Sequence, residues 1–508
     1  MPAIHKQLVP QQYPGVLRKL TKPKRVVVIG GGLAGMAAAT ILAERGAIVT
    51  VVEHENELGG RARGWSDTLP DGTPVQLERG FHAFFRQYYN LRELFKRFDP
   101  RLSMLVPMAD YPVLAPDGQV ELFAEIPRFP PANVLAMVKH SPLLRWHDML
   151  KVGFRHAFEM LSYEQAKTFE RWDHTTAAQF LDAVAFPKQA RAMIFDVFAH
   201  SFFNPQTEMS AAEMLQYFHF YFTHNPEGLT FDALDQPLHT AIWQPLTRYL
   251  HTMPTQLRLG TDAVRLQKDG DGWLVHTRPA DVGQGAPTEP LACDAVVLAA
   301  TVTAVRDIVA ASGDIGDQPW RAAIASQRAT RPFAVQRFWL DRPVRADRPV
   351  FAAIAGGGIL DSIAVYNHVA DTSAQWAAAT GGSEVEIHAY AMPAHLTADD
   401  ARAQMTERLH HFYPETRAAK VLHSTFALSQ DSPAFAVGTA HLRPRVHSPD
   451  PTLALAGDYT WIPLPSGLME RAVASGFLAA NCLLSHYNVR GEPLWSVPRR
   501  GYLADWTA

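Results

Sequence analysis

Three glycines near the amino end of the chain are spaced to bind a dinucleotide. An apolar run, residues 26–29, leads directly into the pattern Gly30-x-Gly32-x-x-Gly35. Glycines in such a turn let the backbone approach a pyrophosphate, and the amino end of a following helix stabilises its negative charge. Glu53, at the end of the next β-branched run, supplies a carboxylate that accepts hydrogen bonds from a ribose.

The elements that position these residues form a strand, a helix and a second strand. The segment after Gly35 is rich in alanine and stops at Gly46, which is typical of a helix and its carboxyl end. Residues 47–52 are mostly β-branched and predict the second strand. A fortuitous glycine-rich turn is the alternative. We favour the dinucleotide site because the strand before, the helix after and the acid all agree with it.

A second glycine pair indicates which dinucleotide is bound. Leu58-Gly59-Gly60-Arg61-Ala62-Arg63 follows Glu53, and such an extension suits a cofactor that is held permanently. The whole unit resembles the flavin amine oxidase and phytoene desaturase superfamily. The resemblance implies FAD, with Glu53 on the adenosine ribose and Arg61 near the pyrophosphate. Glu53 would also repel the 2′-phosphate of NADP.

The same resemblance extends to later segments of the chain. It implies that Gly80 passes close to the flavin ring and that the backbone of Val264 contacts adenine. An apolar strand ends in Gly457-Asp458, and the resemblance places this acid on the ribityl and phosphate region. The helix that follows directs its first amides at the flavin. The residues predicted to contact the cofactor are Gly30, Gly32, Leu33, Ala34, Gly35, Glu53, Gly60, Arg61, Arg63, Gly80, Phe81, Val264, Gly457, Asp458, Leu468 and Met469.

Aromatic residues gather in three segments, residues 81–85, 198–203 and 217–222. Their number suits the wall of an apolar tunnel, although packing within the core is an equal alternative. A capping box of Ser210 and Glu213 is predicted to start the helix that carries the third segment. The residues predicted to contact a substrate are Phe84, Phe202, Phe203, Tyr217 and Phe220. His82 and His200 are the candidate proton acceptors, and a hydrogen-bonded core histidine is the alternative for His82.

Four segments carry a narrower resemblance: residues 79–92, 200–215, 217–229 and 464–471. They are similar to carotenoid desaturase/methyltransferase enzymes of the isorenieratene synthase-like kind, which form aromatic carotene rings. The implied reaction removes hydride from a β-ionone ring, moves a methyl group by a 1,2-shift and releases a proton. Aromatic faces would stabilise the intermediate cation. Phe81, Phe84, Phe202 and Phe203 are predicted to do so.

Three other functions share these motifs. The first is a phytoene-desaturase-like desaturase or isomerase of another polyisoprenoid. The second is an amine oxidase, which normally has a lysine and water pair at the flavin. The third is a flavin-binding protein without turnover.

Composition indicates a folded protein of more than one domain. The chain has 508 residues, of which 47% are hydrophobic and 19% charged. The predicted fold class is α/β: a Rossmann-like FAD-binding domain of the amine oxidase/glutathione reductase type, interleaved with an α+β substrate domain. We assign residues 1–80, 245–305 and 441–508 to the first domain, and residues 81–244 and 306–440 to the second. The formal net charge of −3 points to no nucleic acid, and no metal-ligand spacing is found.

The predicted location is the cytoplasm, at the inner face of the membrane. No leader is recognisable, and two separated cysteines favour a reducing compartment. Residues 6–25 form a basic, partly apolar arm, which can bind an anionic membrane or be a solvated tail. Residues 127–178 predict two amphipathic helices with basic faces, which border a lipid entrance or simply cover a core. The expected partner is a lipophilic, carotenoid-like small molecule.

Overall fold

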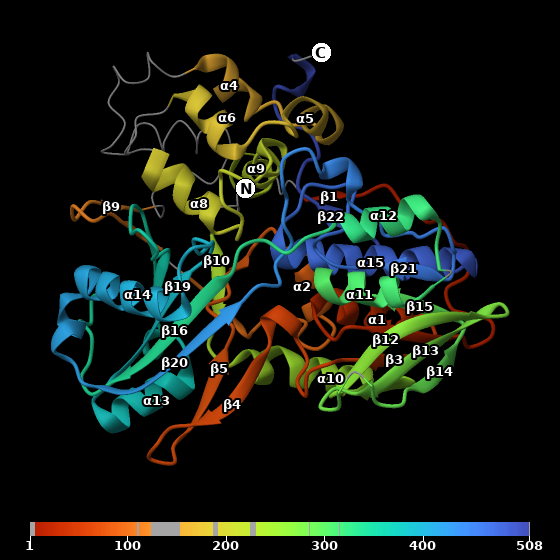
Figure 1. Ribbon diagram of the computed structural model, residues 1–508, viewed down its shortest axis with the longest axis horizontal. Coiled ribbons are helices and arrows are strands. Elements are labelled where there is room, and N and C mark those ends of the chain that lie inside the picture. Colours follow the sequence, from red (N-terminus) through yellow and green to blue (C-terminus); the bar gives the residue numbers. More distant parts are fainter. Residues whose placement is uncertain are drawn as a thin grey trace.

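The computed structural model describes residues 6–108, 111–122, 153–185, 191–223, 230–283, 285–313 and 315–506. Two large sheets lie toward opposite ends of the molecule, and a group of helices that includes α4, α5 and α6 lies above them in Figure 1. This mixed architecture confirms the predicted α/β fold class. The division into two interleaved domains stays a prediction in its boundaries.

The first sheet is parallel and has five strands in the order β11-β3-β2-β15-β21. Both faces are covered, which explains why its strands are almost continuously apolar. Val26 and Val28 face helices α1 and α15, whereas Val27 and Ile29 face α11 and α12. The elements are β2 (Arg25–Ile29), α1 (Leu33–Glu44), β3 (Ile48–Val52), β11 (Thr255–Arg258), β15 (Ala295–Leu298), α11 (Val302–Ala311), α12 (Gln318–Ser326), β21 (Leu453–Leu455) and α15 (Leu468–His486).

Two glycines let the helices on this sheet pack closely. A Cβ atom at Gly35 would lie 1.9 Å from the carbonyl oxygen of Gly30, and one at Gly476 would lie 2.2 Å from that of Ala34. Both distances are shorter than any tolerated contact. Helix α1 can therefore approach the end of β2 only because Gly35 has no side chain, and α15 can approach α1 only because Gly476 has none. Gly35 therefore acts in packing, and we place it there rather than in contact with a ligand.

The second sheet is mixed and has seven strands in the order β20-β16-β19-β18-β17-β8-β9. Successive side chains of β19 point to opposite faces. Val385 and Ile387 pack against helix α14, while Glu384, Glu386 and His388 lie on the other face. The elements are β8 (Val113–Leu114), β9 (Val120–Glu121), β16 (Phe333–Leu340), β17 (Phe351–Ile354), β18 (Ser362–Val365), α13 (Asp371–Thr380), β19 (Ser383–Ala389), α14 (Ala398–Phe412) and β20 (Val421–Ser429).

The remaining elements connect the two sheets. The hairpin of β4 and β5 turns at Asp71-Gly72, and helix α2 follows β6. The amphipathic helices predicted in residues 127–178 fall partly on 127–152, which lie outside the described residues. The elements are β4 (Gly64–Thr68), β5 (Pro74–Glu78), β6 (Phe84–Phe85), α2 (Tyr89–Phe95), β7 (Leu105–Pro107), α4 (Phe154–Glu159), α5 (Gln165–Trp172), α6 (Ala177–Val184), α8 (Val197–His200), α9 (Ala211–Phe218), β10 (Phe231–Leu234), α10 (Gln244–Leu250), β12 (Thr261–Asp269), β13 (Gly272–Pro279) and β14 (Glu289–Cys293).

The predicted capping box at the start of α9 is wrong. Ser210 is the N-cap, and its hydroxyl accepts the amide hydrogen of Ala212. Glu213 does not reach back to the cap. Its buried carboxylate pairs with two arginines, Arg443 at 2.9 Å and Arg471 at 2.6 Å. Opposite charge nearby attracts this carboxylate more strongly than a single backbone amide does.

The basic arm is docked on the body of the protein, which corrects the prediction of a solvated tail. Strand β1 (Gln7–Leu8) pairs with β22 (Trp495–Ser496) near the carboxyl end, and Val9 is buried. The Lys6 ammonium pairs with Glu93 at 3.1 Å. In the described part of the chain, no helix has the length and apolar character needed to cross a membrane.

Candidate active site

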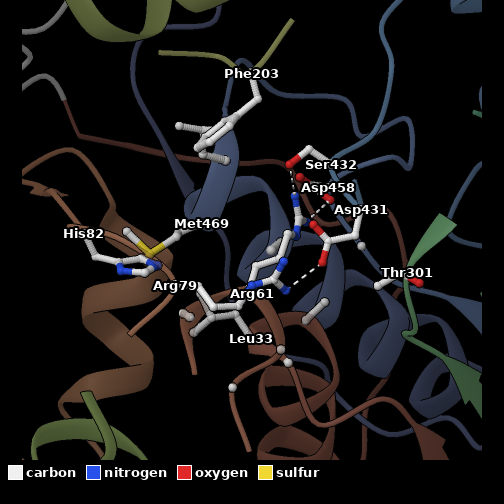
Figure 2. Close-up of a pocket in the computed structure, with 18 of the residues that line it drawn as sticks. Leu33, Arg61, Arg79, His82, Phe203, Thr301, Asp431, Ser432, Asp458 and Met469 are labelled. Carbon is white, nitrogen blue, oxygen red and sulfur yellow. Dashed lines mark hydrogen bonds and ion pairs between the residues drawn. The ribbon is translucent and has the colours of Figure 1, made fainter. Parts of the chain in front are cut away.

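A cavity of about 470 Å³ lies between the two large sheets and is lined by residues of both. Glycine-rich backbone and charged side chains line one part of it, and aromatic side chains line the other. Figure 2 shows the polar part, in which Arg61 and Arg79 lie close together, while His82 lies on the opposite side beside Met469. We describe the polar part first, because the sequence predicted most of it.

The amino end of α1 opens into the cavity without a side-chain cap. Gly32 is the N-cap, its first turn holds no acidic residue, and Leu33 and Ala34 line the cavity. The first amides of a helix that lack partners attract an anion. Gly60 faces Gly32 so closely that a Cβ atom on it would lie 3.3 Å from the Gly32 Cα. This uncapped helix end, bordered only by backbone, fits a pyrophosphate.

Glu53 is buried at the end of β3 and lines the same cavity. Its carboxylate accepts the amide hydrogen of Gly31 at 2.5 Å and that of Glu55 at 2.9 Å. Burial raises the pKa of Glu53, and the two amides act against this rise. The side chain is thus held at the strand end, where it was predicted to meet a ribose.

Two arginines pair with two aspartates in the centre of the cavity. Arg61 donates to Asp458 at 2.6 Å and to Ser432 at 3.4 Å, and Arg79 donates to Asp431 at 2.6 Å. Burial alone would lower the pKa of Arg61, but Asp458 raises it. Asp458 was predicted beside the cofactor, and Gly457 also lines the cavity.

The amino end of α15 also points into the cavity. Leu468 and Met469 line it, and the N-cap Gly467 makes no side-chain cap. Leu468 adopts a positive φ of 47°, which is uncommon for a residue other than glycine. Glu470 turns away and accepts the backbone amides of Asn90 and Leu91. The first amides of α15 are therefore left for a ligand, as the predicted contact with the flavin requires.

Not every predicted cofactor residue lies on the cavity surface. Gly30, Gly80 and Phe81 do, but Arg63 and Val264 do not. Arg63 instead forms an ion pair with Glu55. Val264 occupies an irregularity in the pairing of β12 with β13, beside Ala263 of the cavity wall. This irregularity frees its backbone from the regular ladder, so the predicted backbone contact with adenine stays a proposal.

Aromatic side chains form the other part of the wall. Phe81, Phe202 and Phe203 lie there, as predicted, and Phe203 adopts a positive φ of 60°. A non-glycine residue held in this region indicates that its neighbours fix the backbone. The other phenylalanine and tyrosine residues that line the cavity are Phe85, Tyr88, Tyr111, Phe198, Tyr221, Phe222, Phe231, Phe333, Phe351, Tyr390 and Tyr459.

Three predicted substrate residues lie behind this wall and need correction. Phe84 points away from the cavity and packs on Phe95, with ring centres 5.9 Å apart. Tyr217 stacks behind Phe202 at 4.1 Å, and Phe220 is buried against Tyr88. They support the residues of the wall and are not part of its surface.

The two candidate histidines differ in their positions. His82 lines the cavity, and burial lowers its pKa to about 4, so its ring is neutral at pH 7. Its Nδ1 has no hydrogen-bond partner among the described residues. His200 is not on the cavity surface, which corrects the prediction of direct catalysis. Its Nδ1 lies 2.9 Å from Asp361, and this carboxylate also accepts the amide hydrogen of Tyr390 at 2.6 Å.

Replacing His82 with asparagine should reduce the loss of stability in acid. The unfolded chain takes up a proton near the ordinary histidine pKa of about 6.5. The folded protein does so only near 4, so stability falls as the pH drops between these values. Thermal midpoints measured from pH 7 to pH 4 should fall less steeply in His82→Asn than in the wild type. Parallel curves would contradict the assignment, and His441→Asn, at an exposed position, is the control.

The polar face of the second sheet, which borders the cavity, was not among the predicted parts of the site. His388 and Tyr390 both line it, from β19 and the residue after its end. Residues 384–389 alternate between polar and apolar types, which is typical of a strand with one polar face. That alternation is the signal by which they could have been found. Asp431 and Ser432 carry no such pattern.

The fold and the site define an FAD-dependent oxidoreductase. A family model described as flavin containing amine oxidoreductase matches residues 33–484, and the chain belongs to this family. Among curated proteins, a carotenoid phi-ring synthase of Streptomyces griseus is 44% identical over 94% of this chain and 90% of its own length. One from Chlorobaculum tepidum is 30% identical over 96% and 92%. A 15-cis-phytoene desaturase of Solanum lycopersicum is 23% identical over 92% and 79%.

Solved structures agree on the fold. A putrescine oxidase variant superimposes with a TM-score of 0.65, at 15% identity, over 91% of this chain and 99% of its own. Cyclohexylamine oxidase from Brevibacterium oxydans gives 0.63, also at 15% identity, over 92% and 99%. They confirm the predicted fold class, while the family match and the curated relatives confirm the predicted superfamily and the flavin cofactor.

Proposed function

We propose that the chain converts the β-ionone end ring of a carotenoid into an aromatic ring, by desaturation with a 1,2-methyl shift. The observation that carries the proposal is that one cavity continues from the groups predicted to hold FAD to a wall of aromatic rings. The 44% identity to a carotenoid phi-ring synthase supports the same ring chemistry, and favours the phi ring as the product.

The wall suits the intermediate that this chemistry requires. When bound, FAD supplies the oxidising group that takes a hydride from the ring. The carbocation left behind has no water to stabilise it in an apolar pocket, so it depends on the negative faces of aromatic rings. Phe81, Phe202 and Phe203 present such rings to the cavity. A methyl shift from the carbon that carries two methyl groups then opens the way to proton loss and further oxidation.

Two alternatives have less support. An amine oxidase would be expected to hold a lysine at the flavin, yet none of the described residues that line the cavity is a lysine. A desaturase of another polyisoprenoid would share the fold and the aromatic wall. Such a desaturase would form a different product, so analysis of the pigments that the enzyme makes separates it from the proposed function.

Expression of the chain in a β-carotene-producing bacterium tests the proposal. We expect a pigment lighter than β-carotene by four hydrogen atoms for each modified end, because two successive oxidations make each ring aromatic. Chromatography with absorption and mass spectra measures this. Unchanged β-carotene, beside purified protein that carries its yellow flavin, would contradict the proposed substrate.

We propose further that the protein takes its lipophilic substrate from a membrane on the cytoplasmic side. The docked arm supports this, because Val16 (73% exposed) and Leu17 lie beside the exposed cations Arg18, Lys19 and Lys22. Each such charge contributes about 1 kcal/mol at an anionic surface. Replacing the three cations with glutamine should lower the affinity for anionic vesicles by roughly a hundredfold in a flotation assay. The same change at Arg342, Arg345 and Lys420, which are also exposed, is the control, and equal losses would contradict the proposal.

A further inference from the structure

A chain of polar side chains runs from the aromatic wall into the second sheet. The Tyr390 hydroxyl lies 2.9 Å from the Ser362 Oγ, which lies 2.9 Å from the Nδ1 of His388. The Nε2 of His388 lies 2.8 Å from Glu386. Ser362 is paired with His388 across β18 and β19, so the sheet itself sets this spacing. Tyr390 and His388 line the cavity.

The charge on Glu386 fixes the direction of every hydrogen bond in the chain. Burial alone would raise the pKa of Glu386, but Arg337 and His388 lower it to about 2, so the group is a carboxylate. A carboxylate only accepts, and therefore the Nε2 of His388 carries a hydrogen. The Phe81 amide also points at Nε2, at 3.2 Å, but the shorter bond to an anion is the stronger one.

The directions of the other two hydrogen bonds follow from the hydrogen on the Nε2 of His388. In a neutral imidazole the other nitrogen, Nδ1, has a lone pair and accepts the Ser362 hydroxyl hydrogen. The Ser362 oxygen then accepts the hydrogen of Tyr390. All the donors point away from the cavity. A lone pair of the Tyr390 oxygen is thus left to receive a proton from the cavity side.

We propose that Tyr390, Ser362 and His388 form a relay that removes the ring proton of the substrate, and that Glu386 holds the resulting imidazolium. This inference rests on the proposed function, which requires a proton to leave a carbocation inside an apolar cavity. Tyr390 is the catalytic residue, because it meets the substrate. Ser362, His388 and Glu386 act through it.

Atoms and electrons balance along the relay. The C–H bond next to the cationic carbon breaks, and its electron pair becomes the new C=C bond. The proton joins the Tyr390 oxygen, the Tyr390 hydrogen passes to Ser362, and the Ser362 hydrogen bonds to the Nδ1 of His388. The hydride removed in the same oxidation goes to FAD. An external acceptor of two electrons and two protons, such as a quinone, then receives both and resets the relay.

Acidic side chains surround the inner end of the relay. Arg337 pairs with both Glu384 and Glu386. Glu78 lies near the same arginine, and the Tyr366 hydroxyl donates to Glu386 at 3.0 Å. Glu386, 2.8 Å from the Nε2 of His388, is placed to hold an imidazolium that forms during the reaction. Asp361 holds the backbone of Tyr390, as described above, and so fixes the entrance of the relay.

Breaking the relay at one or both links tests it. Tyr390→Phe and Ser362→Ala should each slow single-turnover formation of the aromatic ring by roughly a hundredfold or more. The double variant should be no slower than the slower single variant, because a chain that is broken once carries no proton. A solvent deuterium isotope effect should be present in the wild type and absent from the variants. FAD content should stay unchanged, and Tyr413→Phe, whose buried hydroxyl is away from the cavity, should match the wild-type rate.

Two results would overturn the relay: a Tyr390→Phe rate within threefold of the wild type, or losses that multiply in the double variant. Failure of the proposed function looks different, since the FAD-loaded wild type would then leave β-carotene unchanged. The relay is in that case judged by the ¹⁵N signal of His388, assigned through its loss in His388→Gln. Hydrogen on Nε2 in the wild type, and its displacement in Glu386→Gln, would support the relay. Hydrogen on Nδ1 would overturn it.

Discussion

Gly32→Asp should weaken FAD binding roughly a thousandfold, while the cofactor-free protein becomes slightly more resistant to heat. An aspartate at this N-cap accepts the same first amides of α1 that a pyrophosphate needs, because Gly32 has the extended backbone of a capping residue. The new cap and its charge at the helix end contribute about 1 kcal/mol or less to stability. Two unit charges about 4 Å apart at an effective dielectric of about 20 repel by about 4 kcal/mol, which lowers affinity roughly a thousandfold.

Gly32→Asn is the matched control for this variant. Asparagine has the same size and also caps a helix, but it carries no charge. Flavin titration of the cofactor-free proteins should therefore show a much larger loss for aspartate than for asparagine. Equal affinities in the two variants would mean that the amino end of α1 does not hold the phosphates. A fall in the thermal midpoint of cofactor-free Gly32→Asp would contradict the capping argument.

Glu213→Ala should cost the largest amount of stability of any single change considered for this protein. Its carboxylate is the partner of two buried arginines, Arg443 and Arg471. Removing one partner of a buried ion pair leaves an uncompensated charge and typically costs about 3–5 kcal/mol. Here two guanidinium groups are affected, and the Ser466 carbonyl is the hydrogen-bond acceptor that remains for Arg471 among the described residues. Urea unfolding of the FAD-loaded protein measures the change.

An exposed ion pair provides the comparison. Glu208 pairs with Arg331 at the surface, with 49% of its side chain exposed. Glu208→Ala should change the free energy of unfolding by no more than about 1 kcal/mol. Similar losses in Glu208→Ala and Glu213→Ala would show that burial does not determine the cost. Glu213→Gln keeps the shape but not the charge, so it separates packing from electrostatics.

The nucleotide half of the site was predictable because its chemistry is local. A turn that must pass close to a pyrophosphate admits few residues besides glycine, so Gly30 and Gly32 can be recognised without knowledge of the fold. The same holds for Glu53, which must follow the second strand. Gly30, Gly32 and Glu53 all belong to one βαβ unit, and all three line the cavity.

The substrate half was only partly predictable because it depends on which way each side chain faces. Phe84 and Phe85 are neighbours in β6 and point to opposite faces, so only Phe85 reaches the cavity. Composition cannot distinguish them. The relay depends on pairing between distant strands, since Glu386 meets Arg337 across β19 and β16. The alternation of β19 predicts a polar face but not the strand that lies opposite.

The separation of the site residues along the chain has a consequence for biosynthesis. Arg61 and its partner Asp458 lie 397 positions apart, and the helix that follows Asp458 closes the same cavity. A ribosome must therefore complete most of the message before the cofactor pocket exists. Truncated chains that end before α15 lack part of the pocket, however well their first strands fold. Acquisition of FAD should thus require synthesis through the start of α15, and yellow colour in a purified sample indicates chains that extend at least that far.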